Sequence, residues 1–290
     1  MSIGILLVIE NLDLGFTAHG QTNKAPVIYT TMDFIILLFT FLFGLIIGSF
    51  LNVVICRLPK GKKINGRSHC PHCDSKLAWF DLVPLLSFIA LRGKCRHCRA
   101  PISWQYPAVE LTAGALFALS AIIRQQEPGT TPNLWFTLLR DWVVISALLV
   151  TFVTDLRFQL IYDAVILLAA GAVFLLNVII GAPLLPFAIA GIIGMSFFGL
   201  QYVVSRGRWI GAGDIYLGGF IGIAVSFPQI LLALACAYLA GASVAIPLLL
   251  SQHKTWQSRI AFGTFLSAAG IVTLFWGNQI LDWYLHLISS

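Results

Sequence analysis

This sequence has little charge. Charged residues make up 10% of its 290 residues, and 58% of the residues are hydrophobic, whereas a typical soluble domain carries about 25% charged residues. The shortage of charge excludes a soluble globular protein. Apolar runs near the ~20 residues that cross a hydrocarbon core instead recur from Met32 to the C-terminus. The sequence therefore predicts an all-α, polytopic membrane protein.

About eight transmembrane helices are expected. The predicted spans cover residues 33–55, 106–123, 138–154, 160–180, 184–204, 214–227, 229–250 and 261–287. The predicted organisation is an extension at 1–31, a first transmembrane helix at 32–55, a polar four-cysteine insertion at 56–105 and a membrane core at 106–290.

Two further absences narrow the possible classes of protein. No nucleic-acid-recognition motif accompanies the net charge of +6, so no nucleic-acid partner is expected. Residues 1–31 have neither a basic n-region nor a small-residue cleavage site, which excludes a secretory signal peptide. We expect that segment to be a poorly structured extension.

The positive charge is concentrated in one segment. Residues 56–105 hold ten of the eighteen Lys and Arg residues, and such residues stay cytoplasmic in short loops. With eight spans, fifteen of the eighteen fall on one side. The insertion is therefore predicted to be cytoplasmic, and both termini extracytoplasmic. Its basic character suits docking against an anionic membrane surface.

The insertion carries a cysteine pattern that is typical of a metal site. Cys70, Cys73, Cys95 and Cys98 form C-x2-C-x21-C-x2-C, and two such pairs close a tetrahedral Zn²⁺ shell with no open position. We expect a structural zinc ion. Two disulfides, iron or an empty reduced site are the alternatives, although stable disulfides are rare in the cytoplasm. Three neighbouring histidines could replace a ligand: His69, His72 and His97.

Two aspartates interrupt the apolar runs. Asp155 lies at the end of the third predicted span and Asp214 at the start of the sixth, so both lie on the same membrane face. If they approach each other they share a proton, the state that an aspartyl protease needs. Gly211 and Gly213 precede Asp214 and would let a substrate strand approach the main chain. The alternative is that both aspartates only cap helices.

Two other acidic residues lie on the same face. Asp163 falls about one turn into the fourth predicted span and could orient Asp155 or line the cleft. Glu110 lies near the start of the second span and could hold a substrate amine or pair with a basic residue. An ordinary interfacial carboxylate is the alternative for each of them.

Taken together, these segments resemble the type IV prepilin leader peptidases, also called leader peptidase/N-methyltransferases. The matching blocks are "GSFLNVVICRLP" at 48–59, the four-cysteine segment at 70–111, Asp155 through Asp163, and "GAGDI" at 211–215. Their order is that of the family, and the resemblance covers most of the chain from Met32 onward.

The resemblance implies a function. In this family the aspartates that match Asp155 and Asp214 form a membrane-embedded dyad of the Gly-x-Gly-Asp type. The dyad cuts the short basic leader from prepilins and pseudopilins at the cytoplasmic face of the bacterial inner membrane. Members with the cysteine domain usually also methylate the new N-terminus with S-adenosyl-L-methionine. No Rossmann fingerprint is present, so the methyl-donor site is expected in the 56–111 region by resemblance alone.

Some positions depart from the family pattern. Tyr162 stands where the first motif commonly has Pro, and Tyr216 where a Lys commonly follows the catalytic Asp. The segment "IAFGTFL" at 260–266 lacks both usual prolines. A catalytically inactive relative that acts in pilus assembly is therefore one alternative. A transporter with intramembrane carboxylates is another, although the outer halves of the spans offer few polar residues for a pathway.

Overall fold

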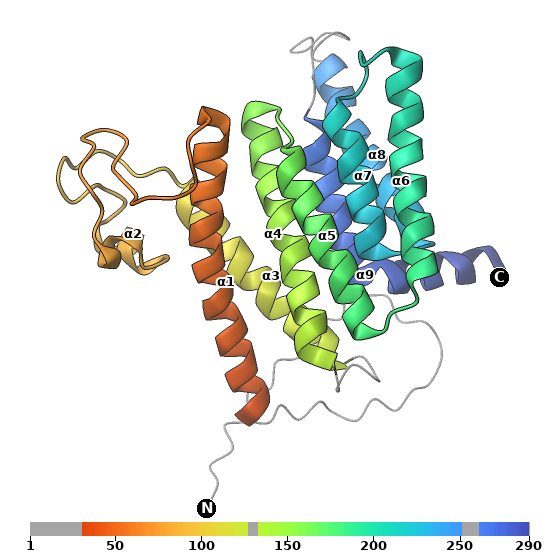
Figure 1. The fold of residues 1–290 in the computed structure, drawn as a ribbon, viewed down its shortest axis with the longest axis horizontal. Coiled ribbons are helices and arrows are strands. Elements are labelled where there is room, and N and C mark those ends of the chain that lie inside the picture. Colours follow the sequence, from red (N-terminus) through yellow and green to blue (C-terminus); the bar gives the residue numbers. More distant parts are fainter. Residues whose placement is uncertain (1–30, 127–132, 251–260, 290) are drawn as a thin grey trace, which may run out of the picture.

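The computed structural model describes residues 31–126, 133–250 and 261–289, and these residues are helical without a strand (Figure 1). Seven described helices are long and apolar enough to cross a membrane, and Ala212–Val225 is a shorter apolar helix. The predicted all-α, polytopic fold is confirmed. The helices of the bundle are α1 (Thr31–Arg57), α3 (Gln105–Gln126), α4 (Leu134–Phe158), α5 (Asp163–Ile180), α6 (Leu184–Ser205), α7 (Ala212–Val225), α8 (Gln229–Leu250) and α9 (Phe262–Ser289).

The predicted spans match these helices closely. The largest difference at a site concerns α5, which begins at Asp163 and not at residue 160. Gln159 takes a left-handed conformation with φ 54° and ends α4, and its N–H donates to the carbonyl of Asp155. Asp163 is therefore the first residue of α5, and the prediction that it lies one turn inside a helix is wrong. Residues 1–30 of the expected extension at 1–31 lie outside the described residues, and residue 31 begins α1.

Small residues let two helix pairs pack closely. In α6 and α7, a Cβ added to Gly194 would lie 2.2 Å from the carbonyl oxygen of Gly218, and one added to Gly222 would lie 2.2 Å from that of Ala190. In α1 and α3, a Cβ added to Gly48 would lie 2.7 Å from the Cα of Glu110. Small residues at such contacts are typical of membrane helices, where close van der Waals packing drives association.

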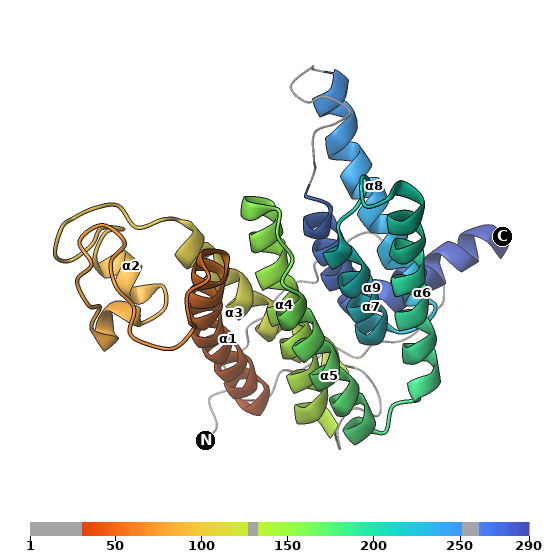
Figure 2. The same cartoon turned by 45° about the horizontal axis from the view of Figure 1, so that its top comes forward.

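The polar segment between α1 and α3 contains three short helices, η1 (Leu58–Lys60), η2 (Trp79–Leu82) and α2 (Leu86–Ala90). In Figures 1 and 2 it lies beside α1, on the side away from α6, α7 and α8. The main hydrophobic core is built from the bundle helices, and none of its residues lies between 59 and 104. The insertion is thus packed onto the bundle without sharing its core.

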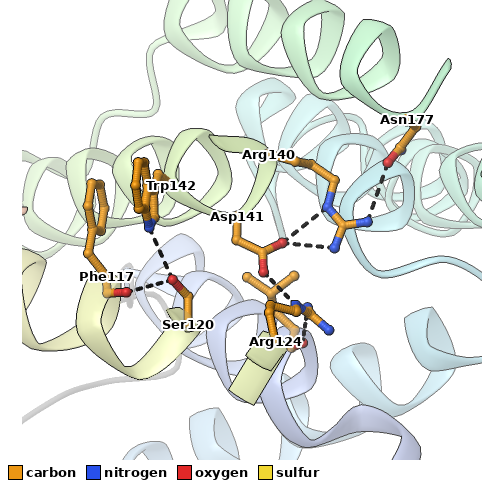
Figure 3. Close-up of polar contacts among 8 residues, drawn as sticks. Phe117, Ser120, Arg124, Arg140, Asp141, Trp142 and Asn177 are labelled. Carbon is orange, nitrogen blue, oxygen red and sulfur yellow. Dashed lines mark hydrogen bonds and ion pairs between the residues drawn. The ribbon is translucent and has the colours of Figure 1, made fainter. Parts of the chain in front are cut away.

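A buried ionic network holds the end of the bundle where α3 stops and α4 starts (Figure 3). Asp141 is fully buried, and its carboxylate pairs with Arg124 at 2.7 Å and with Arg140 at 2.8 Å. Arg140 also reaches the side chain of Asn177 in α5. The few polar residues in the outer halves of the spans thus converge from three helices into one local network.

Candidate active site

Asp155 occupies the last turn of α4 and is 5% exposed. Its Oδ2 accepts a hydrogen bond from the backbone N–H of Thr264 at 2.7 Å and another from the Thr264 hydroxyl at 3.2 Å. Thr264 belongs to the first turn of α9, where backbone N–H groups have no partner within the helix. The Asp155 carboxylate therefore caps α9 from a different helix, and the positive end of the α9 dipole faces it.

Asp214 occupies the first turn of α7 and is 6% exposed. Its Oδ2 accepts the backbone N–H of Gly211 at 3.0 Å, so Asp214 does cap its own helix, as the alternative interpretation held. Its Oδ1 is buried and has no hydrogen-bond partner among the described residues. Helix capping thus occupies one oxygen of this carboxylate and leaves the other for chemistry.

The two carboxylates meet at one end of the bundle. Both α4 and α7 pack against α5 and α9, and Asp155 and Asp214 are close enough to interact electrostatically. Ile161, in the connection from α4 to α5, packs against Gly213, which precedes Asp214, and against Gly263, which precedes Thr264. A Cβ added to Gly213 would lie 2.7 Å from Cβ of Ile161, and one added to Gly263 would lie 2.8 Å from its Cδ1.

Three of the remaining predicted site residues lie at the end of the bundle that carries the two aspartates. Of these, Asp163 and Gly211 are exposed. A Cβ added to Gly211 would meet only ordinary contacts, the nearest being Asp214 Oδ2 at 3.6 Å. Gly213 is different, because its missing side chain makes room for Ile161.

Glu110 is joined to the insertion. It is 7% exposed, its Oε2 accepts the backbone N–H of Leu85 at 2.9 Å, and it also hydrogen-bonds to Ser49. The structure therefore connects Glu110 to residues of the insertion and of α1. Its role toward a substrate amine stays a prediction.

Two residues near the aspartates were not identified from the sequence. In the sequence, Thr264 is only a departure from the family pattern. Its contact with Asp155 joins positions 109 residues apart, so no local pattern predicts it. Tyr238 of α8 donates its hydroxyl to the side chain of Gln201 at 2.8 Å and lies in the neighbourhood of Asp214. Its ring packs against Phe262, with the centroids 4.9 Å apart. No local motif marks either residue.

The four cysteines of the insertion converge. Their sulfur atoms all lie within 4.8 Å of one another, and those of Cys70 and Cys98 are 3.8 Å apart. Zinc–sulfur bonds of about 2.3 Å in a tetrahedron place sulfur atoms about 3.8 Å apart, so the donor set fits a metal site with four thiolate ligands. The three histidines are not members of this described cluster. All six cysteines of the chain are free thiols.

The two C-x2-C turns are built alike. Cys70 donates its N–H to the carbonyl of Ser75, and Cys95 donates its N–H to that of Ala100. Hydrogen bonds with Ser75 lower the pKa of the Cys73 thiol to about 6. Backbone hydrogen bonds with Cys98 and His97 lower the pKa of the Cys95 thiol. Both effects favour thiolates, the form in which cysteine binds a metal, whereas burial and the neighbouring thiols raise the pKa of the Cys98 thiol to about 11.

Comparison with known proteins identifies the chain. The "Bacterial Peptidase A24 N-terminal domain" matches residues 42–123 and the "Type IV leader peptidase family" matches residues 142–246. The prepilin leader peptidase/N-methyltransferase of Aeromonas hydrophila is 32% identical over 275 residues, which cover 84% of this chain and 92% of that protein. The proteins of the same name from Legionella pneumophila (30% identical; 84% of this chain, 92% of that protein) and Bacillus subtilis (30%; 85% and 97%) are also similar.

No solved structure matches the chain. The sequence relatives extend over most of the described helices, including those that carry Asp155 and Asp214. By these matches, the chain belongs to the type IV leader peptidase family of aspartic peptidases.

Proposed function

We propose that this protein cleaves the leader peptide from prepilins and pseudopilins, with Asp155 and Asp214 as its catalytic dyad. The observation that carries the proposal is the convergence of these two buried carboxylates, which occupy unlike hydrogen-bonding environments. The name that the relatives share, prepilin leader peptidase/N-methyltransferase, supports the substrate class.

The hydrogen bonds suggest separate roles for the two aspartates. Hydrogen bonds donated to a carboxylate stabilise its ionised form, and Thr264 donates two to Asp155 Oδ2. We assign Asp155 as the base that takes a proton from the attacking water. The unpartnered Oδ1 of Asp214 carries the proton that polarises the scissile carbonyl. In the next step the proton on Asp155 passes to the leaving amine, and the dyad returns to its starting state.

The surroundings of the dyad fit a basic leader followed by an apolar helix. Asp163 adds negative charge at the same end of the bundle, and the space above Gly211 leaves room for a substrate backbone. The rest of the substrate would lie in the bilayer beside the bundle. This arrangement accounts for Asp163 and Gly211 as supporting residues; Gly213 supports the site through its contact with Ile161.

The proposal also covers the methylation reaction, the metal site and the membrane in which the protein lies. The relatives' name supports N-methylation of the new N-terminus with S-adenosyl-L-methionine, and we place the methyl donor in the 56–111 region, with Glu110 as a candidate for holding the amine. Structural Zn²⁺ on the four cysteines would organise the 56–105 domain. The excess of Lys and Arg in that domain supports a cytoplasmic orientation in the inner membrane, against an anionic membrane surface.

Cleavage of a prepilin with a short basic leader, assayed in membranes, tests the dyad. We expect Asp155→Asn and Asp214→Asn each to lower the cleavage rate by about 10²–10⁴-fold or more, because each removes one partner of the acid–base pair. Asp282→Asn, the same chemical change at an exposed position near the other end of α9, is the matched control and should cleave normally.

Mass spectrometry of the new N-terminus adds the second activity. A mass increase of one methyl group that requires S-adenosyl-L-methionine is expected. Normal cleavage by either dyad variant would overturn the two-aspartate mechanism. The transporter and the inactive relative are not favoured, because the relatives share the name of an active peptidase.

A further inference from the structure

The insertion contains an apolar segment that the protein itself does not cover. Residues 79–91 read "WFDLVPLLSFIAL" and are called the apolar loop below. Neither η2 nor α2, which lie in it, has a buried residue. Trp79 is 78% exposed, Leu86 is 66% exposed and Ile89 is 69% exposed. An exposed apolar patch of this kind in a polar domain marks a contact surface.

The position of the loop along α1 indicates what it contacts. The close approach of Gly48 to Glu110 places these two residues at the same level of the bundle. Gly48 precedes Arg57, the charged end of α1, by nine residues, which is about 13 Å of helix. Glu110 Oε2 binds the N–H of Leu85, just before α2, at 2.9 Å. Leu85 is therefore held below the charged end of α1.

That depth lies within a bilayer leaflet. The hydrocarbon core is about 30 Å thick, so each leaflet contributes about 15 Å. Figure 1 shows α2 beside α1 and below the upper end of that helix. An apolar run of 10–14 residues is too short to span a membrane and is typical of an interfacial or re-entrant segment. The length of the loop fits this class.

Part of the loop's polar backbone is satisfied internally, as hydrocarbon requires. The N–H groups of Ser87, Ile89 and Leu91 donate to the carbonyls of Val83, Leu85 and Ser87, and that of Gly93, just after the loop, donates to the carbonyl of Phe88. Its one charged residue, Asp81, pairs with Arg96 at 2.9 Å, and the Asp81 side chain is 4% exposed. The N–H of Leu85 is taken up by Glu110.

Basic residues come directly after the loop, namely Arg92 and Lys94. An apolar face with Lys and Arg at its margin binds a membrane through buried apolar area together with attraction to anionic head groups.

We propose that the apolar loop, residues 79–91, enters the adjacent leaflet of the bilayer, where Trp79, Leu86 and Ile89 contact lipid acyl chains and the flanking basic residues bind anionic head groups. The insertion is thus a membrane-embedded part of the protein. This placement does not depend on the cleavage reaction, since it uses no residue of the Asp155–Asp214 dyad.

Lipid crosslinking in the full-length protein tests the proposal. A photoreactive diazirine residue is placed singly at Leu86, at Ile89, or at Lys76, an exposed residue of the same insertion that serves as the matched control. The protein is reconstituted in vesicles of phosphatidylethanolamine and phosphatidylglycerol. We expect phospholipid adducts to be several-fold more abundant at Leu86 and Ile89 than at Lys76. Retained metal content verifies that each variant is folded.

A measurement with an intact loop accompanies the crosslinking. Lipids brominated in the middle of the acyl chain should quench the fluorescence of Trp79, read as the difference between the unaltered protein and Trp79→Phe. Equal lipid adducts at all three positions, or no quenching of Trp79, would overturn the proposal. Crosslinks from Ile89 to another polypeptide would also overturn it, because the surface would then be covered by a substrate helix or a second copy of this chain.

Discussion

The contact between Thr264 and Asp155 is the most specific interaction at the proposed dyad. One residue donates both its backbone N–H and its hydroxyl to a single carboxylate oxygen, Oδ2. The residue is itself buried, at 6% exposure, so water does not compete freely for these hydrogen bonds. Thr264 therefore positions Asp155, and its two hydrogen bonds favour the ionised form of that carboxyl.

Removing only the hydroxyl tests this role. Thr264→Val keeps the shape of the side chain and the backbone N–H, and we expect kcat for leader cleavage to fall about tenfold, the effect of losing one hydrogen bond to a charged group. KM should change little, because the substrate is not contacted. Thr264→Ser restores the donor and should restore kcat. Equal activity of the Val and Ser variants would show that the hydroxyl has no catalytic effect.

The sequence predicts the reactive groups better than their supports. Asp155, Asp214 and the four cysteines are recognisable because charge in an apolar run and paired C-x2-C spacing are rare. Thr264 and Ile161 carry no such signal, since a threonine or an isoleucine is ordinary in any helix. Gly213 was assigned to substrate approach, whereas its Cβ position is taken by Ile161. Which atoms meet there depends on how α5, α7 and α9 pack.

At the scale of the helix, α7 packs closely against α6, because no space is left for a side chain at the glycines of α7 that face α6. The space for a side chain at Gly222 is filled by the carbonyl of Ala190, at 2.2 Å, and that at Gly218 by the ring of Phe198, at 2.5 Å. Since Asp214 lies in the first turn of α7, this contact also helps to set the position of its carboxylate along the bundle.

Gly222→Ala should therefore push α7 away from α6. Overpacking of this kind costs about 1–3 kcal/mol, and we expect a lower Tm in detergent together with slower leader cleavage. Gly199→Ala, on α6, is the matched control: nothing lies within 4 Å of its Cβ position, so stability and activity should be unchanged. Equal stability of the two variants would contradict the close packing.

The ionic network at the other end of the bundle makes a separate contribution to stability. Asp141→Asn would leave Arg124 and Arg140 without their shared carboxylate in a buried site. Breaking a buried pair in this way costs about 3–5 kcal/mol. We expect a large fall in the Tm of the purified protein, measured by thermal unfolding, and Asp282→Asn should leave the Tm unchanged. An unaltered Tm for Asp141→Asn would show that the network is not stabilising.

Hydropathy predicts the helix boundaries of this protein but not its tertiary polar contacts. The eight spans were placed within a few residues because each apolar run reports its own length. The convergence of Arg124, Arg140 and Asp141 carries no signal in the sequence, because it depends on the packing of α3, α4 and α5. The insertion is predicted to be polar, yet its residues 79–91 are apolar, and the helices η2 and α2 in this segment bury none of them.

At the scale of the whole molecule, the bundle and the insertion are stabilised by different means. The core of the bundle includes no residue between 59 and 104. Within the insertion, Cys70 and Cys95 are buried while η1, η2 and α2 bury nothing. A polypeptide of this size without its own hydrophobic core requires a metal or another crosslink to fold. The insertion should therefore lose its structure with its metal, while the bundle keeps its own.

Metal removal separates these two parts. A strong chelator should remove one metal ion per chain, and a double variant, Cys70→Ser with Cys95→Ser, should bind none. Either change should open the insertion to trypsin at Lys76 and Lys94. The helical content and the Tm of the bundle should change little, because no core contact is lost. Cys236→Ser, a half-buried thiol of α8 outside the cluster, should retain the metal and resist trypsin. Loss of helical content along with the metal would mean that the four-cysteine site stabilises the entire fold, in spite of the separation between its residues and the core.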